Sequence, residues 1–549
     1  MKKIIIFSVL ALLLTGCDSF LDTENLTQKD TSNFPENKEE MMAMLTGVYS
    51  AARNMEMDEN AASSFVVSEI LSDDRFTGGG PDDKNWANLE KFVSTSPNMF
   101  DETWANAYKA IYRANTLLLS LDKIQWDDPQ ERSYIEGQAY FLRGYTYFYL
   151  ARFFGSAPIV LTPEPVNNPR ASAEEMYAQI ASDLKLAIEK MPSTPKVQER
   201  GRATKWAAQG ILARAFLFYT GYYKKDSMPL VNEGSLTKAQ VISYLDDCIA
   251  NSGHDLYPDF RNLWPYSNLL SKRDGYKYSV NNDLQWAGET GGNYETVFAF
   301  QSITKVTWDN PIDCNRLNLY FSIREQDEAG IFPYGKGWGF GTVNSKLWDT
   351  WPATDIRRKG SIIDVTDPNE MPDYQWAADH QQHETGFWQK KYVAVNVKTS
   401  SGYVNYSKEM FGETVNDDYQ INNTQDLVVL RFADILLMAA ELKQDAGPLN
   451  LVRGRAGLGN IAYSETALRN ERRWELAFEG IRYYDLLRWD IAGEALNAQN
   501  GIEVKNDNAT AQMSLGDLAK RITETGGFMP ISQKQISLSA GVLKQTPGW

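Results

Sequence analysis

The side chains that could perform catalysis or hold a metal ion are few in this sequence. Of its three histidines, only His380 and His383 lie close together, flanked by Asp379 and Glu384. A zinc site needs a third protein ligand, and the helical zinc sites of many proteases follow the order HExxH, which is absent here. The arrangement therefore predicts a solvated polar turn, with no metal and no other cofactor.

Two further patterns come close to catalytic motifs. Residues 330–337 read GIFPYGKG, which resembles a phosphate-binding loop but ends in Gly337, where Ser or Thr must hold magnesium. Acidic doublets could supply the two carboxylates of a glycosidase, but nothing fixes a pair at the required separation. These doublets are Asp73-Asp74, Asp82-Asp83, Asp127-Asp128 and Asp246-Asp247. We therefore expect a protein that is not an enzyme.

Aromatic residues, by contrast, are abundant. They make up 12% of the chain, with 15 Trp and 28 Tyr, which is more than most cores require, so some rings are expected to face a ligand. The formal charge of -16 disfavours nucleic acids, anionic lipids and other anionic polymers, because phosphate contacts need a cationic surface. A ligand bound mainly through ring contacts fits this composition better.

The first residues predict export and a lipid anchor. Two lysines precede an apolar run, 4–14, which at about 1.5 Å per residue is too short to span a bilayer. The sequence Leu-Thr-Gly-Cys that ends at Cys17 is similar to a lipobox, so we expect 1–17 to be a lipoprotein signal and Cys17 to be acylated. The alternative is an ordinary secretory signal with a chance cysteine. The polar stretch 18–33 would be a flexible tether.

Helical periodicity dominates the first half of the chain. Apolar residues recur at helical spacing in five segments, namely 38–54, 102–124, 129–153, 173–190 and 202–223. Two of these starts carry capping signals, Asp128 before Pro129 and Ser172 with Glu175. Small residues in the last segment indicate helices that cross closely. We therefore expect degenerate tetratricopeptide-like repeats over 34–261.

The middle of the chain, 262–425, has a different composition. Gly, Asn, Asp and Trp are frequent, and only short runs such as 296–300 and 392–397 have β character. A long loop region this rich in aromatic residues is expected to bind a ligand rather than to be disordered.

The C-terminal part, 426–549, returns to helical periodicity at 427–443 and 464–492. Apart from Cys17 the chain has only Cys248 and Cys314, so a disulfide between these two stays open. We predict a mainly α fold, a tetratricopeptide-like helical-repeat superhelix with long irregular insertions that contain short β-strands.

One C-terminal segment is specific enough to indicate a family. Residues 469–489 read RNERRWELAFEGIRYYDLLRW, which closely resembles the signature of the SusD/RagB family. Segments at 155–158, 202–215, 430–441 and 545–549 are similar to the family in the same order, so the resemblance covers essentially the whole chain.

The signature also has a structural interpretation that is independent of any family. As one helix it would place Glu479 beside Arg482 and Asp485 beside Arg488 as ion pairs. It would also form an apolar stripe of Trp474, Ala477, Phe478, Ile481 and Tyr484. We therefore expect the signature to be part of the core rather than a contact with a partner.

The resemblance implies a function. Members of the SusD/RagB family are lipid-anchored outer-membrane proteins that face outward and work beside a SusC-like TonB-dependent transporter to import oligosaccharides. This implies glycan binding at the cell surface, without catalysis and with the membrane contacted only through the lipid. Capture of peptides or another nutrient by the same architecture, and a purely adhesive role, stay open.

The resemblance also implies that two loop regions form the ligand site. The first would be 68–92, where Arg75 supplies a fork of donors, Trp86 a flat ring and Asn88 an amide. The second would be 284–340, with the rings of Trp286, Trp308, Tyr320, Phe332 and Trp338. Pyranose rings have apolar faces bordered by hydroxyls, so stacking rather than charge is expected to carry binding.

Overall fold

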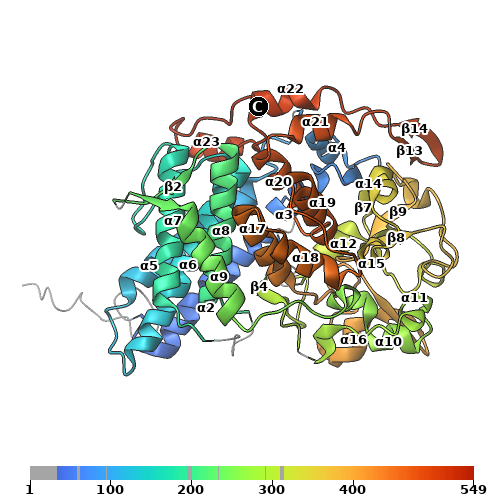
Figure 1. Cartoon of the computed structure of the whole chain (residues 1–549), viewed down its shortest axis with the longest axis horizontal. Helices are drawn as coiled ribbons and strands as arrows, with labels where there is room; N and C mark the ends of the chain where they lie inside the picture. Colours follow the sequence, from blue (N-terminus) through green and yellow to red (C-terminus); the bar gives the residue numbers. More distant parts are fainter. Residues whose placement is uncertain are drawn as a thin grey trace, which may run out of the picture.

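The computed structural model describes residues 34–57, 62–93, 96–194, 201–232, 234–290, 292–309 and 314–549. Cys17 and the predicted tether lie outside these described residues. The long helices of the N-terminal half stand together on one side, the loop-rich segments lie on the other, and the C-terminal helices lie between and above them, together with α3 and α4 (Figure 1). Within the described part of the chain, none of the helices is both long and apolar enough to cross a membrane.

The helices of the N-terminal half pack in consecutive pairs, α2 with α5, α6 with α7 and α7 with α8. This half contains α2 (Lys38–Glu56), α3 (Ser64–Ile70), β1 (Arg75–Gly78), α4 (Lys84–Glu90), α5 (Asp101–Ser120), α6 (Pro129–Phe154), α7 (Ala173–Lys190), α8 (Lys205–Tyr222), β2 (Ser227–Pro229), β3 (Ser235–Thr237) and α9 (Lys238–Asn251).

Local signals explain where these helices begin and how closely they cross. Ser172 and Glu175 form the predicted capping box of α7, and Asp128 caps α6 as predicted. At Gly210 in α8 a Cβ atom would come within 2.4 Å of Leu430, so the close crossing requires glycine. The predicted mainly α, tetratricopeptide-like architecture is confirmed.

The middle region consists of short elements joined by loops. They are η2 (Phe260–Leu263), η3 (Pro265–Ser267), α10 (Leu269–Arg273), α11 (Lys277–Asn281), η4 (Ala287–Thr290), β4 (Thr296–Phe300), α12 (Leu317–Phe321), β5 (Ile323–Arg324), α13 (Glu328–Ile331), β6 (Lys336–Gly337), β7 (Phe340–Val343), α14 (Ser345–Thr350), α15 (Ile356–Ser361), β8 (Ile362–Asp364), η6 (Ala378–His380), β9 (Phe387–Gln389), β10 (Asn396–Thr399), β11 (Gly402–Asn405), α16 (Tyr406–Phe411) and η7 (Gly412–Thr414). Strand β4 confirms the prediction at 296–300, whereas the strand predicted at 392–397 begins only at Asn396.

The C-terminal part begins with a strand. It contains β12 (Leu427–Arg431), α17 (Phe432–Lys443), α18 (Ala446–Arg455), α19 (Glu465–Glu475), α20 (Arg482–Arg488), α21 (Ala492–Asn497), β13 (Glu503–Asn506), β14 (Ala509–Gln512), α22 (Leu518–Thr525) and α23 (Gln533–Leu538). The helix predicted over 427–443 is therefore wrong for its first five residues, because β12 pairs with β4 of the middle region. Within the described residues, the strands form two-stranded sheets.

The signature is not one continuous helix, which corrects the sequence-based interpretation. The chain leaves α19 after Glu475 and enters α20 at Arg482, with φ of 65° at Phe478 and 71° at Gly480. A Cβ atom on Gly480 would lie 2.6 Å from the Phe65 ring, so the break needs glycine at this position.

The break redistributes the side chains of the predicted stripe and its ion pairs. Phe478 is buried in a small cluster with Trp351, whereas Tyr484 belongs to the main core. Asp485 pairs with Arg488 at 2.7 Å as predicted. Glu479 does not pair with Arg482; its carboxylate instead receives Lys391 at 2.6 Å and Arg431 at 2.7 Å.

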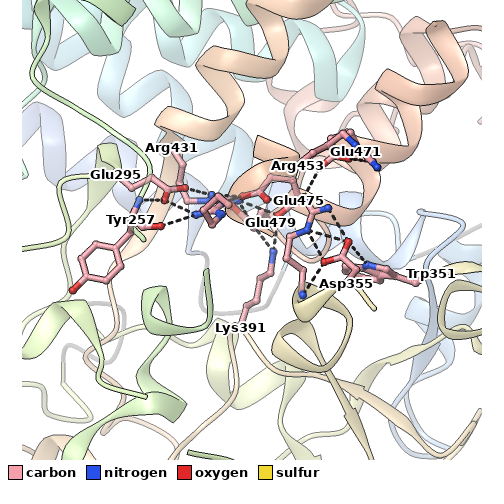
Figure 2. A network of polar contacts seen from close by, with 12 residues as sticks. Tyr257, Glu295, Trp351, Asp355, Lys391, Arg431, Arg453, Glu471, Glu475 and Glu479 are labelled. Atoms are coloured by element: carbon pink, nitrogen blue, oxygen red, sulfur yellow. Dashed lines mark hydrogen bonds and ion pairs between the residues drawn. The ribbon is translucent and has the colours of Figure 1, made fainter. Parts of the chain in front are cut away.

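These last contacts belong to a buried ion-pair network that joins the middle region to the C-terminal helices (Figure 2). Arg431 contacts Glu295, Glu475 and Glu479, and Arg357 contacts Asp355, Glu471 and Glu475. Among the described residues, five cations face five carboxylates: Arg357, Lys391, Arg431, Arg453 and Arg455 with Glu295, Asp355, Glu471, Glu475 and Glu479. The network is therefore formally neutral, and its side chains are buried apart from that of Arg453, which is partly exposed.

The two cysteines of the described chain do not form a bridge. Cys248 and Cys314 are both buried, and no disulfide joins them. Packing and the buried ion pairs therefore hold the fold without a covalent cross-link between these thiols.

Candidate functional site

The two predicted loop regions converge through a pair of strands. Strands β1 and β7 are antiparallel, with Gly78 opposite Phe340, and the Gly79 amide donates to the Gly339 carbonyl at 2.7 Å. The loop that follows β1 therefore lies directly beside the residues that precede β7. This pairing places 79–88 and 336–340 on one surface.

The centre of this surface is a group of stacked planar side chains. The Trp338 ring is half-buried and lies 5.1 Å from the Tyr320 ring, which is buried behind it. The guanidinium of Arg316 lies 5.5 Å from the Trp338 ring and 5.8 Å from the Tyr320 ring. The carbonyl of Leu319 accepts the Trp338 backbone amide at 2.8 Å, so α12 fixes the position of the ring.

Arg324 joins the two loops at the edge of this group. Its Nη1 donates to the Trp338 carbonyl at 3.1 Å, and its Nη2 pairs with Asp379 at 2.7 Å. Burial raises the pKa of Asp83, and the positive charge of Arg324 opposes that rise. Asp83 also accepts the Gly80 amide at 2.7 Å and so closes the turn before α4.

Helix α4 carries two of the predicted ligand residues. Trp86 is only 9% exposed, and its ring lies 6.0 Å from the ring of Phe340. Asn88 is partly exposed two residues later on the same short helix. Trp86 thus packs mainly beneath the surface, and Asn88 lies at the margin of the surface.

A second exposed ring borders the surface on the side of 416–420. Trp308 is 52% exposed, and its Nε1 donates to Asp418 at 3.1 Å. The neighbouring Tyr419 donates its hydroxyl to Glu325 at 3.4 Å, and the ammonium of Lys336 lies 4.7 Å from the Tyr419 ring. Because Lys336 precedes Trp338 by two residues, Trp308 and Trp338 belong to one continuous rim.

Arg75 does not reach this surface, which disagrees with its predicted role as a ligand donor. Its side chain is 1% exposed, pairs with Glu69 at 2.7 Å and donates to the Gly341 carbonyl at 2.7 Å. Its guanidinium also lies over the rings of Phe321 and Phe478. Arg75 is thus a core residue that ties β1 to β7 and to the signature.

Two other predicted rings belong to a different cluster. Trp286 packs edge-on against Tyr406 with ring centres 5.5 Å apart, and Phe332 packs against Tyr403 at 5.8 Å. Both partners come from the stretch that joins β11 to α16. Phe332 is buried and is covered by the ammonium of Lys398 at 4.3 Å. The structure therefore does not bring these two rings to the surface formed by β1 and β7.

Two titratable side chains lie close together near the Gly78 end of β1. Burial raises the pKa of Glu90 to about 7, and its carboxylate accepts the Thr77 amide at 3.0 Å. Desolvation lowers the pKa of His383 to about 4, and the His383 Nδ1 lies 3.9 Å from Glu90. Glu90 is buried, whereas His383 is partly exposed. His380 is exposed and pairs with Asp507 at 3.1 Å, so the polar turn predicted around the histidines is only partly solvated.

Metal ligands do not gather here. Among the described residues, no group of three or more His, Cys, Asp or Glu side chains is arranged to hold a metal ion. The surface presents rings, guanidinium and amide groups, which can stack on a ligand and donate hydrogen bonds.

Family models match both ends of the chain. A SusD-like model described as starch-binding and associating with the outer membrane matches residues 19–217, and the SusD family model matches residues 320–549. The chain belongs to the SusD/RagB family. The signature recognised in the sequence lies within the second match, and the strands β1 and β7 each come from one of the two matched parts.

Relatives and solved structures of the SusD/RagB family extend over nearly the whole chain. A SusD-like protein of Formosa agariphila is 23% identical over 89% of this chain and 90% of its own length, and one of Bacteroides ovatus is 24% identical over 89% and 82%. The surface glycan-binding protein A of Bacteroides thetaiotaomicron, solved with laminarihexaose, has a TM-score of 0.71 at 21% identity and covers 93% of this chain and 100% of its own. A laminarin-binding SusD-like protein has a TM-score of 0.69 at 24% identity over 94% and 100%. These structures show the same fold.

Several residues of this SusD/RagB surface were missed from the sequence. They are Arg316, Arg324, Lys336, Asp418 and Tyr419. Arg316 and Arg324 lie inside the predicted second loop region, but only the aromatic residues of that region were predicted to bind a ligand. Asp418 and Tyr419 lie about 80 residues beyond it, and no periodicity or motif in the sequence marks them.

Proposed function

We propose that this protein binds glycan at the cell surface on the rings of Trp338 and Trp308, and that it does so without catalysis. The observation that carries the proposal is the convergence of two distant loops on one surface with two accessible indole rings, framed by guanidinium, ammonium, carboxylate and amide groups. Such a surface matches a pyranose, which offers an apolar face and a border of hydroxyls.

The family relationship supports this choice of ligand. The solved relatives named above include one that binds laminarin and one seen with laminarihexaose, and the first family model is described as starch-binding. All share the fold across nearly the whole chain. The region 262–425, with the β1 loop added, is accordingly proposed as the ligand-binding region.

A glycan array probed with the purified mature protein tests this proposal. We expect binding to at least one oligosaccharide, with calorimetry giving a modest affinity and Trp fluorescence changing on binding. Binding to a peptide library with no response on any glycan would replace glycan by peptide as the ligand. Chromatography of the bound oligosaccharide after long incubation checks the absence of catalysis, since a shortened product would contradict it.

We further propose that the protein is acylated at Cys17 after removal of 1–17, that 18–33 tether it to the outer membrane, and that it delivers glycan to a SusC-like TonB-dependent transporter. The lipobox-like sequence and the family membership support this topology. Cys17→Ala should release the protein from the membrane fraction. A pull-down from native membranes in mild detergent should recover a large β-barrel transporter, and recovery of the protein alone would count against delivery.

A further inference from the structure

Arg316 stands out from the other arginines in and around the proposed site. It lies immediately before α12 and is 5% exposed, with its guanidinium against the Trp338 and Tyr320 rings. Its Nε is sealed from solvent without an acceptor, and within the described chain no carboxylate forms an ion pair with it. The charge is therefore almost completely removed from water and has no anionic partner among the described residues.

Neighbouring arginines are satisfied in a different way. Arg324, beside the same ring, pairs with Asp379 at 2.7 Å, and the buried Arg75 pairs with Glu69 at 2.7 Å. A buried charge without a partner is unfavourable, and proteins normally pair such a group or move it into water. A guanidinium without an ion-pair partner, next to an accessible ring, is thus expected where a bound ligand supplies the anionic partner.

We propose that Arg316 binds an acidic substituent, a carboxylate or a sulfate, of a glycan that stacks on Trp338. This inference rests on the proposed function and names the class of glycan. A guanidinium presents a planar fork of N–H groups that matches the oxygen atoms of both substituents. In an acidic sugar the charged group is attached to the pyranose ring itself or one atom from it, so one residue can contact the indole and the guanidinium together.

The acidic character of the whole protein does not oppose this assignment. The net charge of -16 predicts weak attraction for anionic polymers at long range. Exposed charges are screened beyond a Debye length of about 8 Å at physiological salt, whereas a partly buried pair is screened much less. The positive charge of Arg316 beside Trp338 therefore matters more than the net charge of the protein, and it favours an anionic substituent.

A structural role for Arg316 makes a different prediction. If the guanidinium only supports the Trp338 ring, its removal should weaken every glycan that uses the ring, charged or neutral. If it binds an acidic group, its removal should weaken acidic glycans alone. Arg316→Met keeps the apolar stem, and Arg316→Lys keeps the charge without the fork, so these two variants separate the possibilities.

The chain offers a matched control. Arg358 also lies over an indole ring, 3.8 Å from that of Trp348, and its Nε also has no acceptor. Its side chain is partly exposed, in contrast to that of Arg316, and Trp348 lies outside the proposed site. Arg358→Met therefore removes a comparable stacking contact without touching the ligand surface.

The experiment uses the mature protein on an array of polygalacturonate, alginate, chondroitin sulfate, carrageenan, laminarihexaose and other neutral glycans. Each acidic glycan that binds is compared by calorimetry with its carboxyl-reduced or desulfated form, which tells a carboxylate from a sulfate. We expect a tenfold or greater loss of affinity for the acidic form in Arg316→Met, partial retention in Arg316→Lys, and changes within twofold for neutral glycans and for Arg358→Met.

Three outcomes would overturn the inference. These are binding to neutral glycans only, equal affinity for an acidic glycan and its neutral form, or an equal loss on both in Arg316→Met. The proposed function is tested separately by Trp338→Ala on the same array. If only neutral glycans bind, and Trp338→Ala weakens that binding, the proposed function stands and the inference fails. If no glycan binds the wild type, both fail.

Discussion

The helical half and the loop-rich middle bury their polar groups in contrasting ways. In α6 every residue from Phe141 to Phe154 is buried, and most are aromatic or aliphatic, because the helix satisfies its own backbone groups. The middle region has only short two-stranded ladders, and charged side chains also bind the backbone there. Arg324 donates to the Trp338 carbonyl and Lys390 to the Lys359 carbonyl, both at 3.1 Å. Where the region meets α19, Lys391 donates to the Glu475 carbonyl at 3.0 Å.

This difference shows how long loops can present a defined surface. Where long ladders are missing, cationic side chains donate to backbone carbonyls and are neutralised by carboxylates, Lys390 by Glu370 and Lys391 by Glu479. The loops at the proposed site should therefore depend on ion pairs, and the helical stack on apolar packing.

The largest expected effect comes from breaking the buried network. Arg431→Met leaves Glu295, Glu475 and Glu479 with one cation fewer, and loss of one partner of a buried pair typically costs about 3–5 kcal/mol of unfolding free energy. The exposed pair of Lys224 and Asp490 provides the control, since Lys224→Met should cost less than about 1 kcal/mol. Urea denaturation measures both, and equal costs would mean that the network does not stabilise the fold.

The next largest effect is on ligand affinity at the accessible rings. Trp338→Ala and Trp308→Ala should each cost about 2 kcal/mol of binding free energy, near thirtyfold in affinity, with little change in melting temperature. Trp86→Ala should lower affinity and stability together, because the Trp86 ring is nearly buried. Trp348→Ala, outside the site, is the control. Unchanged affinity in both rim variants would move the site elsewhere.

An intermediate effect should appear as a pH dependence with opposite sign at two buried carboxyls, Glu90 at the end of α4 and Asp434 in α17. The pKa of Glu90 is raised from 4.5 to about 7, so the stability that it contributes is complete below pH 4.5 and is lost as the pH rises through 7. Although burial opposes ionisation of Asp434, Arg472 and Arg214 lower its pKa from 3.8 to about 2. Its contribution is present above pH 3.8 and is lost as the pH falls toward 2.

Glu90→Gln tests this contrast. Glutamine resembles the protonated acid, so the variant should match the wild type at pH 5 and exceed its unfolding free energy by on the order of 1–3 kcal/mol at pH 8. Denaturation at the two pH values gives the difference. His383 and Lys91 are the titratable neighbours, and burial lowers the pKa of His383 to about 4, so it stays neutral across this range. A constant difference between variant and wild type would contradict the assignment to Glu90.

The smallest expected effect is the change in glycan affinity caused by substituting Arg482, a residue of the signature. Arg482 forms a bidentate pair with Asp73 at 2.7 and 2.9 Å, two residues before β1, and so fixes the start of the strand that positions the first loop. Arg482→Lys should reduce glycan affinity about fivefold, less than the loss of one hot-spot ring. This loss should shrink in a Trp338→Ala background, because the two changes act through one surface.

A second bidentate pair controls for destabilisation alone. Arg143 binds Asp183 between α6 and α7 at 2.7 and 2.9 Å, and both side chains are buried. Arg143→Lys should cost similar stability and leave affinity unchanged. If both variants lower affinity equally, Arg482 has no specific influence on the site.

The sequence predicted the helical half well because its signals are local. Capping groups such as Ser172 and a 3.6-residue period act within one turn, and they located α7 to the residue. The strand β12 was missed because its apolar run, 427–431, continues into α17, and only pairing with β4 decides between strand and helix. The break at Gly480 was missed for a similar reason, since it depends on contact with Phe65, which is far away in the sequence.

The site was predicted in outline but not in its members. Composition and family resemblance indicated the two loops, and Trp338, Trp308 and Asn88 do lie on or beside the surface. Arg75 was assigned to the surface because no pattern in the sequence indicates that it pairs with Glu69. Arg316 was overlooked because nothing in the sequence shows that a charged residue is buried without a partner.

The strand pair β1–β7 has a consequence for how the protein folds. Arg75 donates to a carbonyl 266 residues away, and Arg473 binds Asp74 across 399 residues. Contacts of such high sequence separation form slowly, because the intervening chain must lose its freedom before they stabilise anything. The helical hairpins, whose contacts are local, should therefore form first during folding. The ligand surface should appear only in the last step, when the C-terminal segment has docked.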